Sequence, residues 1–190
     1  MRTLFLLLAN LITFANATDP VYNAKVVGVT GTASIHGKPA KVGMPIHLGD
    51  TLSTGLESSL QIRTAHGSGF ALNEKTSIVY TQLLDTIDIS VVTGGVMNFV
   101  NPGTHWQVHT PMATAAVRGT AFYVHQDSAR AYYCTCKGHV HYETKTAGPI
   151  DEITTNHKAF QFLPGSDSLR AAPLILHDDS TNARFRKLLE

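Results

Sequence analysis

The sequence predicts an all-β fold, and two observations support that prediction. Between residues 24 and 162, short apolar stretches alternate with turn-forming Gly, Pro, Asn and Asp, and no amphipathic helix of ~10 residues interrupts them. Several stretches alternate with a period of two, so that Leu60 and Ile62 would face one way and Gln61 the other. Short strands that recur every ~8–12 residues are typical of a sandwich, a barrel or a β-solenoid.

The segments that fit a strand follow one another along the chain. In order, they are residues 25–30, 33–36, 51–53, 60–63, 69–72, 77–80, 87–92, 95–100, 106–109, 121–125, 131–136 and 139–143. Residues that favour turns separate them, among them Gly31, Pro39 and the pair Gly94 and Gly95.

The two ends of the chain differ from this strand-rich region. Residues 1–17 have the pattern of a cleavable signal peptide: Arg2 gives a positive start, an apolar run follows, and Ala17 ends a small-x-small cleavage site. Because no later stretch approaches ~20 apolar residues, we expect no membrane span in the mature chain. The prediction is therefore a signal peptide, a β domain over 24–162, and a tail over 163–190 with a short helix at 183–190.

Composition and motifs exclude several classes of function. The chain has 15 Lys and Arg against 14 Asp and Glu, with no cluster of basic residues, so a nucleic-acid partner is not expected. The sequence has no G-x-S-x-G, no H-E-x-x-H and no phosphate-binding loop. We therefore do not expect an enzyme.

A series of glycine-containing motifs resembles the FecR domain family. The motifs lie in the family's order at residues 27–31, 43–55, 60–72, 94–96 and 108–120. The last has the form V-x-T-P-x-A-x-x-x-V-R-G-T, and the resemblance extends over about residues 24–162. It implies parallel, solenoid-like coils rather than a closed barrel, with a β-sandwich as the alternative that periodicity leaves open.

The residues of these motifs are expected to shape the frame of the domain. They are Gly49, Asp50, Gly55, Pro111, Arg118, Gly119 and Thr120. The Asp50 carboxylate can accept backbone N–H bonds in a turn. Gly55 and Gly119 are expected at positive φ or where two backbones approach closely. The guanidinium of Arg118 would bind neighbouring carbonyls or pair with Asp50.

A pair of cysteines, Cys134 and Cys136, is where chemistry is most expected. Residues 132–138 resemble a FecR-domain subgroup with a Y-x-C-T-C-x-G run, in which two histidine-containing segments follow. Here His157 and His177 take those two positions, although Phe160 replaces the proline of the first segment. Two thiolates and two imidazoles would suit Zn²⁺, Cu⁺ or an iron species.

Other interpretations of the thiol pair stay open. His139 and His141 are alternative ligands. The two cysteines could form a strained disulfide, since Cα atoms at i and i+2 of a strand lie ~6.5–7 Å apart, or they could remain free thiols.

Two functions are consistent with the sequence. FecR itself adds a cytoplasmic anti-sigma segment and a membrane helix, and this chain instead resembles the stand-alone exported FecR-domain proteins. The first function is a non-enzymatic periplasmic module of the cell envelope, used for binding, scaffolding or sensing, with an envelope protein or a cell-wall ligand as partner. The alternative is a metal- or redox-responsive protein that acts through Cys134 and Cys136.

Overall fold

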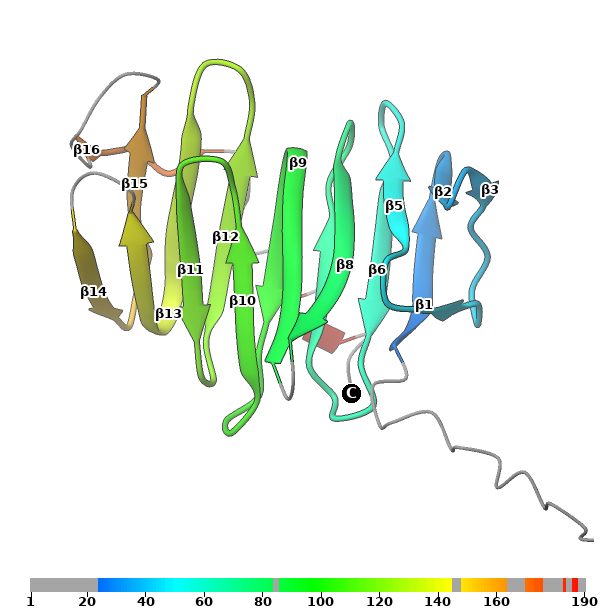
Figure 1. Cartoon of the computed structure of the whole chain (residues 1–190), viewed down its shortest axis with the longest axis horizontal. Helices are drawn as coiled ribbons and strands as arrows, with labels where there is room; N and C mark the ends of the chain where they lie inside the picture. Colours follow the sequence, from blue (N-terminus) through cyan, green and yellow to red (C-terminus); the bar gives the residue numbers. More distant parts are fainter. Residues whose placement is uncertain are drawn as a thin grey trace, which may run out of the picture.

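The structure is a computed structural model that describes residues 24–83, 86–144, 148–163, 170–175, 183 and 186–187. Its elements from Ala24 to Ala171 are all strands, so the all-β prediction is confirmed. Figure 1 shows the strands advancing in chain order along the long axis of the domain, with β1–β3 at one end and β14–β16 at the other. No helix in the described part of the chain is long and apolar enough to cross a membrane.

The strands form two layers, and two long strands belong to both. In spatial order, sheet A contains β4 (Pro45–Ile46), β1 (Ala24–Thr30), β6 (Ser59–Arg63), β7 (Gly69–Leu72), the second half of β9 (Thr86–Phe99), β12 (Ala121–Gln126), the first half of β13 (Ala131–Thr144), β15 (Lys158–Phe162) and β16 (Arg170–Ala171). Sheet B contains β3 (Lys38–Pro39), β2 (Ala33–Ile35), β5 (Thr51–Thr54), β8 (Ser77–Leu83), the first half of β9, β10 (His105–His109), β11 (Ala113–Val117), the second half of β13 and β14 (Pro149–Thr154).

The pairing of the strands corrects the expectation of parallel coils without a closed barrel. Among the described strands, only β9 and β10 pair in parallel, and all other pairings are antiparallel. Five strands also close a hydrogen-bonded ring, which runs from β9 through β10, β11, β13 and β12 back to β9. The sequence could not show this, because alternation reveals which face of a strand is buried but not the direction of its neighbour.

Two glycines at positive φ let β9 and β13 pass from one sheet to the other. Each strand is 14 residues long. Gly94 (φ 86°) stands where β9 leaves β8 and begins to pair with β12. Gly138 (φ 112°) stands where β13 leaves β12 and begins to pair with β14. The sequence predicts two separate strands in each place, whereas the structure has one strand that bends.

The main core lies between the two sheets. Trp106 is buried there, and its indole Nε1 donates a hydrogen bond to the equally buried Asn98 Oδ1 over 3.1 Å. Sheet A also buries its outer face, where Tyr132 and Cys134 have no exposed surface and Ile175 packs against the cluster. The thiols therefore lie outside the main core, in a second apolar layer.

Several elements differ from the predicted strands. The series of expected strands lacks β11, which lies within the motif at residues 108–120, and also β14 and β15. Residue 162 does not end the sheet, because β16 pairs with β15. The short C-terminal helix is unsupported, since most of residues 183–190 lie outside the described part, as does the whole of the expected signal peptide.

Two of the predicted roles of the motif residues are found at the turns. Gly49 has φ 86°, and the Asp50 carboxylate accepts a hydrogen bond from the His47 N–H at 2.8 Å. Gly119 has φ 86°, and a Cβ there would lie 2.9 Å from the Cα of Pro102. Both glycines therefore occupy backbone positions that disfavour other residues.

The other four motif residues differ in their burial and in the contacts that they make. Gly55 is not at positive φ, and a Cβ there would make only ordinary contacts. Arg118 is exposed, and no ion pair of the described residues joins it to Asp50. Thr120 is buried and donates to the His139 carbonyl at 2.7 Å. Pro111 is an exposed residue in a bend before β11.

Substitution of Gly94 by Ala tests the bend in β9. A Cβ at Gly94 would overlap the backbone of Thr76 and lie 2.7 Å from the Lys75 carbonyl oxygen. Gly49 has the same φ with no atom within 4 Å of such a Cβ, so Gly49→Ala is a matched control. We expect Gly49→Ala to lower the free energy of unfolding by about 1–2 kcal/mol and Gly94→Ala by about 3 kcal/mol or more. Urea denaturation measures both, and equal losses would contradict the role given to Gly94.

Candidate thiol–imidazole site

The candidate site lies on the outer face of sheet A, close to the point where β13 changes sheets. Tyr132, Cys134 and Cys136 alternate along β13 and so share one face. β15 pairs with this part of β13 as far as Lys158 opposite Thr135. The next residue back along the chain is His157, whose N–H donates to the Cys136 carbonyl over 3.2 Å. Strand pairing thus sets the histidine beside the two cysteines.

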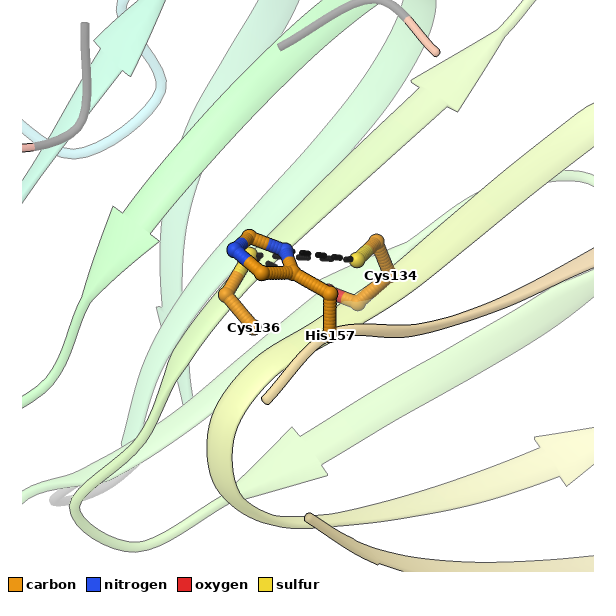
Figure 2. A group of neighbouring side chains, drawn as sticks. All are labelled: Cys134, Cys136 and His157. Atoms are coloured by element: carbon orange, nitrogen blue, oxygen red, sulfur yellow. Dashed lines mark hydrogen bonds between the residues drawn. The ribbon is translucent and has the colours of Figure 1, made fainter. Parts of the chain in front are cut away.

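Two sulfur atoms and one imidazole nitrogen converge at this place. Figure 2 shows the side chains of Cys134, Cys136 and His157 pointing toward one another. The two Sγ atoms are 3.9 Å apart, and the His157 Nδ1 lies 3.5 Å from the Cys134 Sγ. One ligand atom from each residue lies within 4.8 Å of the other two. No disulfide joins the two cysteines, and forming one would require the sulfurs to approach by about 2 Å.

A β-bulge lies at the second cysteine. In the pairing of β12 with β13, Ala121 lies opposite Lys137 and Phe122 lies opposite Thr135, so the register shifts at Cys136. A bulge of this kind bends the strand and redirects the side chain of the extra residue. Cys136 is therefore released from the regular ladder two residues before the bend at Gly138.

The two thiols differ in their access to solvent. Cys134 is fully buried, while Cys136 keeps 6% of its surface exposed and lines a cleft of about 530 Å³ together with His157. Met97 and Phe99 contribute apolar walls to the same cleft. A small solute can therefore reach the site from the side of Cys136 and His157.

Ala172 and Ile175 pack against the apolar layer that contains the thiols. The backbone N–H of Ile175 donates to the Tyr132 hydroxyl over 3.3 Å. Burial, with a smaller contribution from charge on Cys134 and Cys136, raises the pKa of Tyr132 to about 12. The hydroxyl therefore stays protonated at neutral pH and ties the chain near Ile175 to the site.

The other predicted ligands do not join this group. His177 lies outside the described residues. His139 and His141 are on the half of β13 that belongs to sheet B, and both bond to the Asp151 Oδ1, at 3.0 and 2.9 Å. Among the described residues, only Cys134, Cys136 and His157 form a group with the spacing of metal ligands.

The histidine of the site was expected from the sequence, but its surroundings were not. Lys137, Arg186 and Lys187 line the same cleft as Cys136 and His157. Arg186 and Lys187 are 50 residues from the cysteines along the chain, and nothing in the local sequence pattern links them to Cys136. The only available signal was the position of Lys137 directly after Cys136.

Comparison with known proteins gives a consistent family and fold. Residues 50–141 match the family model described as "FecR protein". Two crystal structures of a proposed anti-sigma factor from Parabacteroides distasonis are similar in fold, each with a TM-score of 0.56. Their sequence identities are 17% and 16%, and the similarity covers 64% of this chain and 58% of that protein's chain. No curated protein matches this sequence.

The difference in burial predicts different reactivities for the two thiols. We expect a disulfide reagent such as 5,5′-dithiobis(2-nitrobenzoate) to react faster with native Cys134→Ser protein, which retains Cys136, than with Cys136→Ser protein. The reason is that only Cys136 lines the cleft, while Cys134 has no exposed surface. Both variants should react equally fast in denaturant. Faster reaction of the native Cys136→Ser protein would contradict the described geometry.

Proposed function

We propose that this protein, which carries a FecR domain, is a non-catalytic sensory module of the bacterial cell envelope that binds a soft or borderline metal ion. The FecR match supports the regulatory class. The convergence of Cys134, Cys136 and His157 supports the metal ion as the signal, and it is the observation on which the proposal rests.

Two of the three distances between the donor atoms fit a tetrahedral zinc ion. Two sulfurs bound at ~2.3 Å with tetrahedral angles lie ~3.8 Å apart, and a sulfur and an imidazole nitrogen bound at ~2.0–2.1 Å lie ~3.5 Å apart. The structure has 3.9 Å between the two Sγ atoms and 3.5 Å between the Cys134 Sγ and the His157 Nδ1. Zn²⁺ could therefore bind with little movement of these side chains.

Three protein ligands leave a fourth coordination position for another group. Thiolate and imidazole ligands also suit Cu⁺, so Zn²⁺ and Cu⁺ are the ions to test. Because Cys136 and His157 line the cleft, an ion and a fourth ligand can both enter from that side. His177 remains a candidate for the fourth ligand.

Metal binding at this place would stabilise one arrangement of the outer layer. The ligands come from β13 and from the residue just before β15, which carries β16 on its other edge. An ion would join these elements through its coordinate bonds to Cys134, Cys136 and His157. We propose that a partner protein in the envelope recognises this ordered surface, as befits a domain whose structural neighbours are described as anti-sigma factors.

Zinc titration tests the metal site. We expect the reduced, metal-free protein to bind one Zn²⁺, and Cys134→Ser and Cys136→Ser to weaken binding by about 100-fold or more, because each removes a thiolate ligand. His157→Gln should weaken binding by about tenfold or more. Isothermal titration calorimetry in competition with a chelator measures the affinities, and the same experiment with Cu⁺ shows which ion is preferred.

The exposed His66 provides a matched control for the histidine substitution. It lies in the turn before β7 and does not line the cleft that contains Cys136 and His157, so His66→Gln should bind zinc like the unchanged protein. Equal affinities in all four variants and the unchanged protein would exclude the site.

Cell fractionation tests the location and the partner. The amino-terminal pattern supports export with removal of residues 1–17, so we expect the mature protein in the periplasmic fraction with Thr18 or a nearby residue at its start. Crosslinking in intact envelopes should capture one partner protein with the unchanged chain. Cys134→Ser should capture a smaller amount of that partner. A full-length protein in the cytosol would contradict the proposed location, and equal capture by both chains would contradict metal-dependent recognition.

A further inference from the structure

The two thiols differ in a way that suits a stepwise oxidation. Cys136 lines the cleft of about 530 Å³ that also contains His157, whereas Cys134 is fully buried. A small polar oxidant can therefore reach one thiol before the other. We propose that a hydroperoxide modifies Cys136 and that Cys134 then closes a disulfide with it. Only the effect of this modification on a bound metal ion rests on the proposed function.

The first step is the oxidation of Cys136. Its thiolate attacks the hydroxyl oxygen of the hydroperoxide, so that an S–O bond forms and the O–O bond breaks. The sulfur gives up two electrons, and the oxygen that leaves takes up the proton that the thiol released. The products are a sulfenic acid at Cys136 and an alcohol, or water when the oxidant is hydrogen peroxide. Because a peroxide is small, the 6% of Cys136 that remains exposed gives it access.

Cys134 is placed to react with this sulfenic acid. Its Sγ lies 3.9 Å from the Cys136 Sγ, and the two side chains share one face of β13 (Figure 2). The Cys134 sulfur attacks the Cys136 sulfur, an S–S bond forms and the S–O bond breaks. The hydroxide that leaves takes the Cys134 proton and becomes water. In total, two thiols and one hydroperoxide give one disulfide, one alcohol and one water.

The backbone of β13 makes such a disulfide reversible. Cα atoms two residues apart in a strand are separated by ~6.5–7 Å, close to the upper limit of ~6.8 Å for a disulfide. The register shift at Cys136 is a place where the strand can adjust. The sulfurs must still approach by about 2 Å, so the bond would be strained. Strained disulfides are easily reduced, which suits a signal that is switched on and off.

One further sulfur atom lines the same cleft in the described part of the chain. It belongs to Met97, which peroxide converts to a sulfoxide but which cannot form a disulfide. Met97→Leu removes this sulfur and nearly keeps the side-chain volume. The variant is therefore a matched control, in which disulfide formation should be unchanged.

Oxidation would release the proposed metal ion. The sulfur ligands of a metal are thiolates, and a disulfide contains none, so that His157 alone of the three ligands would remain. A bound ion would in turn occupy both sulfurs and slow their oxidation. The hydroperoxide and the metal ion would thus act on the same thiols in opposite directions.

Hydrogen peroxide and the reduced, metal-free protein test the proposal. We expect intact-mass spectrometry to show that the monomer loses two hydrogen atoms and regains them with dithiothreitol. When dimedone is present to label sulfenic acids, Cys134→Ser should carry at least about tenfold more label than Cys136→Ser, because only Cys136 lines the cleft. The unchanged protein should carry little label, since Cys134 consumes the sulfenic acid. Thermal melting confirms that all variants are folded.

The results that would overturn the proposal are distinct from failure of the metal site. Equal labelling of the two serine variants, a disulfide between two chains, or no disulfide in the unchanged protein would each overturn it. Zinc-loaded protein should release zinc to a chromogenic chelator when peroxide is added. If the metal-free protein forms the disulfide but never binds zinc, only the metal proposal fails. If it binds zinc but forms no disulfide, only the oxidation proposal fails.

Discussion

The bend of β13 at Gly138 is the constraint on which the rest of the structure depends. Together with the bend of β9 at Gly94, it lets two long strands belong to both sheets and so close the five-stranded ring. Backbone at φ of 86° and 112° is open to glycine and strained for other residues. The pairing of β13 with β12 ends directly before this bend, with a bulge at Cys136.

The candidate site follows from this break in the ladder. A cysteine is a small apolar residue and a weak hydrogen-bond donor, so two thiols can be buried on the outer face of sheet A at low cost. Their chemistry becomes available because the bulge, the cleft and His157 meet at the same point.

Much of the fold could be predicted from the sequence, and the errors have a common physical cause. Alternation along residues 60–63 and 106–109 is a local property, and both segments are strands in the structure. Strand direction, ring closure and the membership of β9 and β13 in two sheets depend on contacts between distant residues. Gly94 and Gly138 were expected to end strands, because a glycine at positive φ looks the same in sequence whether the chain turns back or bends onward.

The site was predictable only in part for the same reason. The motif around Cys134 and Cys136 indicated His157 by resemblance, and the structure places its ring at the thiols. The bulge at Cys136 and the approach of Arg186 are tertiary features that no local sequence pattern indicates.

X-ray absorption at the zinc K-edge of the loaded protein tests the central claim most directly. The arrangement of Cys134, Cys136 and His157 on and beside β13 predicts that the zinc ion is coordinated by two sulfurs at ~2.3 Å and at least one imidazole nitrogen at ~2.0–2.1 Å. A shell of oxygen and nitrogen alone would contradict the account, because it would mean that zinc binds elsewhere and leaves the buried thiols untouched.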